Sequence, residues 1–257
     1  MKTFKTLIVA FLLIAMSPAT AQDADQIIAN YFENTGGLEN WSAIKSMEIS
    51  GKITFGPQEF NFTQTTIADG RMAIEVDLQG MKFIPNAFDG KKMWTTNFQS
   101  MEPEELDTET SENYLINDAK DFPDPFLNSS EKGYSYILMG EEQVEGVDTY
   151  KIKLTKNQIT IDGKKEDYFA IYYFDKENFV PIVQESITPS GPQKGTVVKT
   201  VFSDYQEAGD VFVPYSIDIK YNDVVAQSIS ITKVALNSEI NEDIFIMPVK
   251  EAATEKK

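Results

Sequence analysis

Residues 46–88 read SMEISGKITFGPQEFNFTQTTIADGRMAIEVDLQGMKFIPNAF, and apolar and polar side chains alternate along most of this segment. Alternation with a period of two residues is typical of β-strands that bury one face. The pairs Asp69-Gly70 and Gln79-Gly80 interrupt the alternation, and glycine at such places favours tight turns. The segment therefore predicts successive antiparallel strands joined by hairpins.

The same alternation continues through most of the remaining chain. The pair Asp89-Gly90 predicts another hairpin, and strands resume at Tyr134. The later expected strands cover residues 134–139, 148–155, 158–161, 168–174, 182–188, 196–205, 211–221 and 224–236. About eleven strands result. No long helical crossover separates them, which excludes parallel βαβ units.

Three segments break the strand pattern. Residues 23–34 have apolar side chains at helical spacing after a capping aspartate, and residues 38–45 predict a second short helix. Residues 99–130 are acidic and predict short helical turns and a loop, because Pro123 and Pro125 exclude a regular helix or a central strand over residues 121–127. A large sheet curls as it twists, so its concave face needs a cover. The predicted fold is mainly β with a few helices: a large curved antiparallel sheet, a half-barrel, wrapped around an N-terminal helix and a lid segment.

The N-terminus has the features of a secretory signal. Residues 1–21 contain two lysines, an apolar run from Leu7 to Met16, and the small-residue sequence Ala19-Thr20-Ala21. We expect cleavage between Ala21 and Gln22, a single domain over residues 22–250, and a polar tail over residues 251–257. A retained membrane anchor is the less favoured alternative, because the apolar run is shorter than the roughly 20 residues that span a bilayer. The expected location is the periplasm, without stable membrane insertion.

Two residue types are missing from the whole chain. The 257 residues include no histidine and no cysteine, which excludes Ser–His–Asp and Cys–His catalysis and the usual zinc sites. The formal net charge is −17, so phosphate backbones repel the protein and nucleic-acid binding is not expected. The acidic run at residues 102–112 lacks glycine and is interpreted as a solvated face, not as a calcium loop. We expect no enzyme activity, no metal and no cofactor.

The apolar side chains on the expected strands suggest a binding cavity inside the curved sheet. Most of them must be ordinary core, but a large sheet with few helices leaves part of its concave face unfilled. The predicted cavity-lining residues are Phe55, Phe62, Ile74, Val76, Met81, Phe83, Met93 and Trp94. The predicted lid residues are Phe122, Phe126 and Leu127, and Arg71, the only arginine, is a candidate polar contact. The alternative for Arg71 is an exposed residue at the end of a strand.

Several weak motifs in a fixed order resemble one family. They include Tyr31-Phe32 with Thr35-Gly36-Gly37, residues 41–46 (WSAIKS), residues 145–154 (EGVDTYKIKL), residues 172–175 (YYFD) and residues 245–248 (FIMP). Together they resemble LolA-like periplasmic lipoprotein carriers over nearly all of the mature chain. The resemblance implies an eleven-stranded half-barrel closed by a helical lid, an apolar cavity for acyl chains and no catalytic residues. It also implies a strand arginine that is hydrogen-bonded to the lid, for which Arg71 is the only candidate.

Three functions from different classes follow from these observations. The favoured hypothesis is an exported carrier or sensor that binds acyl chains of lipoproteins or other lipids and takes part in outer-membrane lipoprotein sorting. Its expected partners are inner- and outer-membrane sorting proteins, and we expect a monomer. The alternative is a cell-envelope structural or interaction module with a filled core and no lipid ligand. An enzyme that uses paired carboxylates in a polar cleft ranks third.

Overall fold

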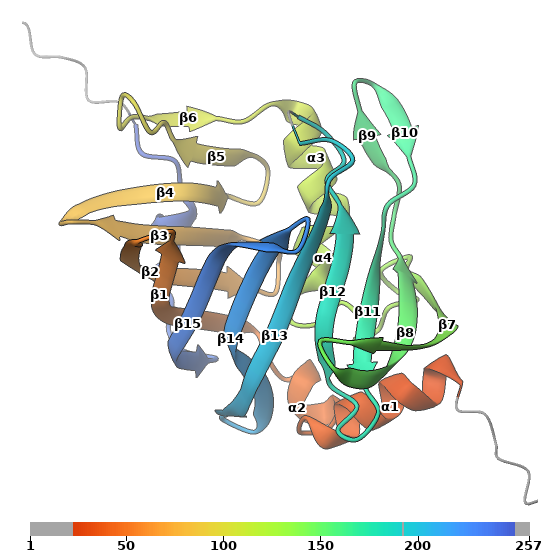
Figure 1. Cartoon of the computed structure of the whole chain (residues 1–257). Coiled ribbons are helices and arrows are strands. Elements are labelled where there is room, and N and C mark those ends of the chain that lie inside the picture. Colours follow the sequence, from red (N-terminus) through yellow and green to blue (C-terminus); the bar gives the residue numbers. More distant parts are fainter. Residues whose placement is uncertain (1–22, 192, 250–257) are drawn as a thin grey trace, which may run out of the picture.

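The computed structural model describes residues 23–191 and 193–249, and its main feature is one antiparallel sheet (Figure 1). The sheet has thirteen strands in the order β6-β5-β4-β3-β2-β1-β15-β14-β13-β12-β11-β8-β7. The strands are β1 (Ser46–Phe55), β2 (Gln58–Ile67), β3 (Met72–Leu78), β4 (Met81–Phe88), β5 (Met93–Thr96), β6 (Pro103–Glu105), β7 (Ser135–Val144), β8 (Val147–Thr155), β11 (Phe169–Asp175), β12 (Pro181–Ile187), β13 (Val197–Ala208), β14 (Val211–Tyr221) and β15 (Val224–Leu236). The predicted fold class is confirmed, with more strands than expected.

The difference in strand number has local causes. β6 forms inside the segment that was expected to contain only helical turns and loop, where Pro103 and two glutamates pair with β5 at the edge of the sheet. Proline and charged residues are tolerated at an edge because one side of the strand has no partner. A separate hairpin, β9 (Ile159–Ile161) with β10 (Lys164–Glu166), lies outside the main sheet.

Strands β1 and β15 pair in the middle of the sheet, although they lie near opposite ends of the domain in the sequence. Their register pairs Ile53 with Ile229 and Gly51 with Ile231, with a bulge between Ser50 and Gly51. A Cβ atom at Gly51 would overlap the carbonyl oxygen of Ser230, so glycine is required for this close approach of the two strands. This pairing brings the first hairpins beside the last ones.

The N-terminal helices form where the sequence predicted them. α1 (Ala24–Asn34) begins after Asp23, whose carboxylate accepts a hydrogen bond from the backbone N–H of Gln26 at 2.8 Å. α2 (Leu38–Ser42) follows a turn in which Gly36 and Gly37 both have positive φ angles. The apolar face of α1, including Tyr31 and Phe32, is buried.

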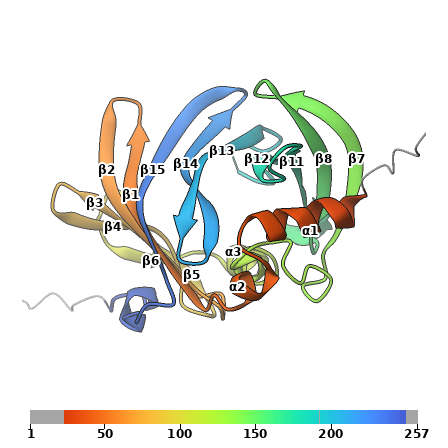
Figure 2. The ribbon, with the colours of Figure 1, turned by 90° about the horizontal axis from the view of Figure 1, so that it is seen from below.

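The sheet curves around these helices (Figure 2). Viewed from below, the strands form an arc, and α1, α2 and α3 (Thr108–Ile116) lie across its mouth. The short helix α4 (Asp118–Asp121) and the lid loop, which is defined as residues 122–127, connect α3 to β7. The largest core cluster lies between α1, the lid loop and the strands β8, β11 and β14.

A second, smaller cluster lies on the other face of the sheet. The 3₁₀ helix η1 (Glu242–Phe245) packs Phe245 against Trp94, Ala73 and Ala87. In the part of the chain that is described, no helix is both long and apolar enough to cross a membrane. The predicted signal, its cleavage point at Ala21 and Gln22, and the tail at residues 251–257 lie outside the described residues.

Candidate functional site

An apolar pocket of about 300 Å³ lies between the lid loop and the concave face of the sheet. The helices contribute Tyr31 and Trp41 to its wall, and the lid loop contributes Pro123, Pro125 and Phe126. The sheet wall comes from β1, β11, β12, β13, β14 and β15, and includes Met47, Ile49, Tyr172, Phe202, Ile217, Ile231 and Val234. We call this space the inner pocket.

The lid loop is fixed to α1 by one buried hydrogen bond. The hydroxyl of Tyr31 donates to a carboxylate oxygen of Asp124 at 2.8 Å. The other oxygen of Asp124 accepts from the backbone N–H of Phe126 at 2.8 Å. Burial raises the pKa of the Asp124 carboxyl and also that of the Tyr31 hydroxyl. These two bonds hold the loop in the closed position over the pocket.

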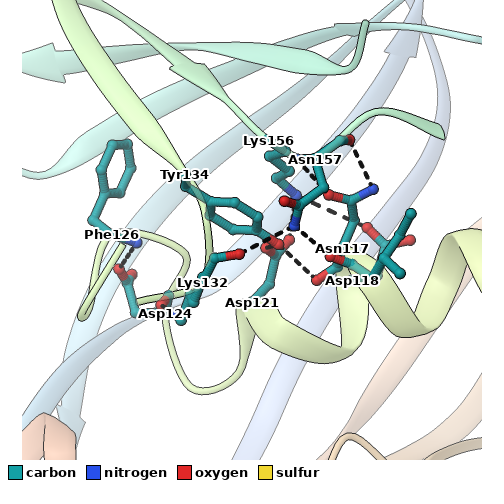
Figure 3. Close-up of polar contacts among 10 residues, drawn as sticks. Asn117, Asp118, Asp121, Asp124, Phe126, Lys132, Tyr134, Lys156 and Asn157 are labelled. Carbon is teal, nitrogen blue, oxygen red and sulfur yellow. Dashed lines mark hydrogen bonds and ion pairs between the residues drawn. The ribbon is translucent and has the colours of Figure 1, made fainter. Parts of the chain in front are cut away.

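A second set of polar contacts fixes the two ends of the lid loop to the sheet (Figure 3). The ammonium group of Lys156, which follows β8, is almost fully buried and forms an ion pair with Asp121 of α4. The hydroxyl of Tyr134 donates to the carbonyl of Asn117 at 2.8 Å and to Asp121 at 3.1 Å. Within the described chain, no buried side-chain polar atom lacks a hydrogen-bond partner, so this network is fully paired.

Asparagine side chains continue the same network. Asn117 and Asn157 bind each other reciprocally, because the Asn157 backbone N–H donates to the Asn117 side chain at 3.0 Å and the Asn117 amide donates to the Asn157 carbonyl at 3.1 Å. The Asn157 amide also donates to the carbonyls of Ile116 and Lys132. These contacts connect Asn157 to the segments on both sides of the lid loop.

The predicted lid residues all contact the largest core cluster. Phe126 and Leu127 are buried, and Phe122 is partly buried against the same cluster. The ring of Phe126 packs edge-on against Tyr172 and Phe174, with centroid distances of 4.9 and 5.4 Å. Phe126 thus forms part of the pocket wall and part of the core at the same time.

Four of the predicted cavity-lining residues lie beside the inner pocket and do not line it. Phe62, Ile74, Val76 and Phe83 pack together on β2, β3 and β4. Their cluster also contains Ile49, Ile217, Ile231 and Val234, which do line the pocket. We call this group the sheet cluster. It extends the apolar surface of the pocket towards the first hairpins.

The other four predicted cavity-lining residues do not belong to the sheet cluster; they are Phe55, Met81, Met93 and Trp94. Phe55 and Met81 are exposed, with 44% and 57% of their surface accessible. Met93 is buried beside α3, and its backbone N–H donates a hydrogen bond to the hydroxyl oxygen of Ser111 at 2.9 Å. Trp94 follows Met93 directly, so its side chain points to the opposite face of the sheet. There its indole N–H donates to the carbonyl of Phe245 at 2.8 Å.

Arg71 contacts neither the lid loop nor the inner pocket. Its guanidinium forms ion pairs with Asp69 at 2.9 Å and with Glu242 of η1 at 2.8 Å. The guanidinium carbon also lies 5.4 Å from the centroid of the Phe245 ring. Arg71 therefore links the C-terminal segment to the β2–β3 turn. The contact between helix and lid is made by Tyr31 and Asp124.

Sequence reasoning missed several residues of the pocket wall. Tyr31 and Trp41 had not been selected as candidate pocket residues, and neither had the apolar residues of β13, β14 and β15. The alternation in those strands indicated which side chains share a face. It gave no information on which part of the sheet lies under the lid loop. Asp124 between two prolines was the one signal that could have indicated a buried anchor.

The residues of the site offer no evident metal centre. Within residues 23–191 and 193–249, no group of three or more acidic side chains is arranged to hold a metal ion. The acidic segment at residues 102–112 contains β6 and the start of α3, and Asp107 in it caps α3 through the backbone N–H of Thr110 at 2.7 Å. Other carboxylates of the segment also have protein partners: Glu105 pairs with Lys92, and Glu109 accepts hydrogen bonds from the backbone N–H groups of Asp162 and Gly163.

These features define a class of fold: a curved open sheet whose concave face is covered by an N-terminal helix and a lid loop. A LolA superfamily protein from Nitrosomonas europaea shares it with a TM-score of 0.53 and 13% identity, over 88% of this chain and 98% of that one. A domain from Vibrio parahaemolyticus, proposed to be an outer membrane lipoprotein-sorting protein, has a TM-score of 0.53 and 11% identity, over 86% of this chain and 94% of that one.

A third solved structure has the same architecture. It is a DUF1329 family protein from Desulfovibrio piger, with a TM-score of 0.52 and 14% identity, over 86% of this chain and 97% of that one. No family model matches the sequence, and no curated protein matches it. The chain therefore has the LolA-like fold, which confirms the fold that the sequence motifs implied.

Proposed function

We propose that this protein is an exported carrier or sensor that binds acyl chains of lipoproteins or other lipids in the inner pocket. The observation that carries the proposal is an apolar pocket placed directly beneath a lid loop that only a few hydrogen bonds hold closed. Apolar walls bind a hydrocarbon chain through burial alone, at about 0.8 kcal/mol for each CH₂ group. No catalytic step is needed for this function.

The size of the pocket indicates how a chain would be accommodated. Ligand pockets in proteins have volumes of about 300 to 1,000 Å³. The inner pocket, at about 300 Å³, is at the lower end of that range. The sheet cluster continues its apolar surface, so a chain longer than the closed pocket would extend along β1 to β3 or displace the lid loop.

Movement of the lid loop would require the loss of identified contacts. Opening at the helix side would break the hydrogen bond between Tyr31 and Asp124. It would also move Phe126 away from the rings of Tyr172 and Phe174. The ion pair between Lys156 and Asp121 lies at the base of the loop and would act as the fixed end.

The ligand class and the location are supported by the comparison with known structures. One structural neighbour is proposed to be an outer membrane lipoprotein-sorting protein, which favours lipidated ligands and a role between the two membranes of the cell envelope. The signal-like sequence of residues 1–21 favours export to the periplasm. Sorting proteins of the inner and outer membranes are the partners that this function would need.

Native mass spectrometry of the protein purified from the periplasm tests the proposal. We expect bound species with the masses of acylated molecules, which dissociate on activation. The Ile231→Asp substitution places a charge in the pocket wall. We expect the bound acylated species to be lost when this variant is prepared in the same way. A consistently empty wild-type protein that also rejects added fatty acyl probes would exclude a lipid-binding function.

A second candidate function is an interaction module of the cell envelope. It is favoured by the extent of the core, since seventeen residues of the largest cluster are buried between α1, the lid loop and the sheet. Such a module would have no lipid ligand and would form a stable complex with another protein. Co-purification of a stoichiometric protein partner with an empty pocket would favour this function over the carrier.

A further inference from the structure

A second hollow of about 720 Å³ lies beside the inner pocket, along residues 201–205 of β13. It is bordered by the C-terminal end of α1, the β7–β8 turn, the β11–β12 connection and β13. We call it the outer groove. Phe202, Tyr205 and Phe212 line both the outer groove and the inner pocket. These three aromatic residues are therefore the partition between the two spaces.

The partition lies where the sheet has a gap. Strands β12 and β13 are paired only from Ile187 with Val197 to Val183 with Val201. β13 continues to Ala208 in pairing with β14, so residues 202–208 have a neighbouring strand on one side only. The hydroxyl of Tyr205 donates a hydrogen bond across this gap to the carbonyl of Pro181 at 2.6 Å. Side chains, and not a backbone ladder, separate the two spaces.

The charges along the outer groove are of one sign. Glu145, Asp175 and Asp204 line it, and no lysine or arginine does. Lys220 neutralises Glu145 at 2.8 Å, and the backbone N–H of Glu177 and of Asn178 donate to Asp175. Asp204 accepts a hydrogen bond from Gln206 and forms no ion pair within the described part of the chain. Asp175 and Asp204 thus both lack a cationic partner among the described residues, and Asp204 is the one that lies at the gap.

We infer that the outer groove and the inner pocket are two parts of one binding site. The hydrocarbon chain of the ligand passes between Tyr205 and Phe202 into the inner pocket, and the polar end remains in the outer groove. Because Asp204 repels anions, a neutral or cationic polar end is bound more tightly there than a carboxylate or phosphate end. This inference rests on the proposed function, and it adds a route of access distinct from the lid loop.

Tryptophan fluorescence can test this route, because the chain has two tryptophans in different places. Trp41 lines the inner pocket, whereas Trp94 lies in the cluster with Phe245 on the other face of the sheet. The probes are ω-bromoundecylammonium and ω-bromoundecanoate, whose bromine quenches a nearby indole. We expect both to quench Trp41, with tighter binding of the ammonium probe, and we expect a Trp41→Phe variant to lose the quenched component.

Two variants with matched controls test the groove itself. Asp204→Asn should reduce the preference for the ammonium probe by about two- to fivefold, the range of a single exposed ion pair. Asparagine also tolerates the positive φ angle of this residue. Asp162→Asn, at another exposed turn residue with positive φ, should leave the preference unchanged.

Ser203→Phe should obstruct the groove and weaken the binding of both probes by about tenfold, whereas Ser135→Phe on β7 should not.

The outcomes distinguish a failure of the outer route from a failure of the carrier function. Quenching of Trp41 that is insensitive to Ser203→Phe and to Asp204→Asn would overturn the outer route and leave a lipid carrier that loads beneath the lid loop. No quenching of Trp41 by either probe in the wild-type protein would overturn the carrier function itself. If Ser203→Phe does not fold, as judged by circular dichroism, the change in probe preference with Asp204→Asn decides the question alone.

Discussion

At the scale of single residues, the two buried charged residues of the described chain, Asp124 and Lys156, both lie at the lid loop or beside it. Tyr31, Asp124, Asp121 and Lys156 all lie on segments that meet there, and each has a partner. A buried carboxylate is costly unless it is hydrogen-bonded, so such groups fix one arrangement of the chain. The lid loop is thus positioned by specific polar contacts as well as by the apolar packing of Phe126 and Leu127.

The pKa shift of Asp124 leads to a pH prediction. Burial raises its pKa above the usual value of about 3.9. The folded state therefore binds the proton more tightly than the unfolded chain, and this group stabilises the fold more as the pH falls through the folded pKa. We expect the stability of the wild type, relative to Asp124→Asn, to increase as the pH is lowered from about 7 towards the unfolded pKa of about 3.9.

Urea denaturation of both proteins across this pH range measures that difference. Asp162→Asn serves as the control, because it makes the same substitution at an exposed turn outside the lid loop. A stability difference between wild type and Asp124→Asn that is constant with pH would show that the carboxyl ionises as in the unfolded chain.

At the scale of elements, the hairpins were predictable and the location of the pocket was not. The alternation in residues 46–88 correctly indicated β1 to β4 and the turns between them. It also showed that Phe62, Ile74 and Val76 share a face. The predicted set included both Met93 and Trp94, which are consecutive on β5, so their side chains lie on opposite faces.

The rest of the site depends on contacts between distant segments. The inner pocket forms where β14 and β15 pass beneath α1 and residues 123–126. This arrangement results from the pairing of β1 with β15 and from the curvature of the whole sheet, and neither is encoded in the period of one strand. The anchoring of the lid loop by Tyr31 likewise joins residues 93 positions apart.

The pairing of β1 with β15 gives a prediction at this scale. Gly51 allows the backbone of β15 to approach closely at a bulge, and a Cβ atom there would collide with Ser230. Gly51→Ala should reduce the free energy of unfolding by about 1–3 kcal/mol, the usual cost of overpacking. Thermal or urea unfolding measures the loss.

A neighbouring residue on the same strand gives the control. Lys52 is exposed and pairs with Glu59 at the surface, so Lys52→Ala should change the stability by no more than about 0.5 kcal/mol. Equal stability of Gly51→Ala and the wild type would show that β1 and β15 can separate locally without cost.

At the scale of the whole molecule, the dominant property is the negative charge. The formal net charge of −17 is spread over a chain whose ion pairs are mostly exposed. Exposed pairs contribute little, whereas the repulsion among the excess carboxylates acts over the whole surface. Screening by salt should therefore stabilise the folded protein.

Thermal unfolding at increasing sodium chloride concentration tests this. The Debye length is about 10 Å at 0.1 M, so most of the effect should appear at or below physiological ionic strength. We expect the Tm to rise by about 2–4 °C for each kcal/mol gained. Choline chloride should raise the Tm by the same amount as sodium chloride if charge screening is the cause. A Tm that falls with salt would mean that the ion pairs outweigh the repulsion.

The sheet remains open, and this leaves two free edges of unequal character. β6 is three residues long and carries Pro103 and two glutamates, features that discourage pairing with another chain. β7 is ten residues long, and Ile137 and Met139 are exposed on it. The two ends of the sheet are therefore not equally protected against self-association. At high concentration, β7 is the strand through which copies of this protein would first add to one another and aggregate.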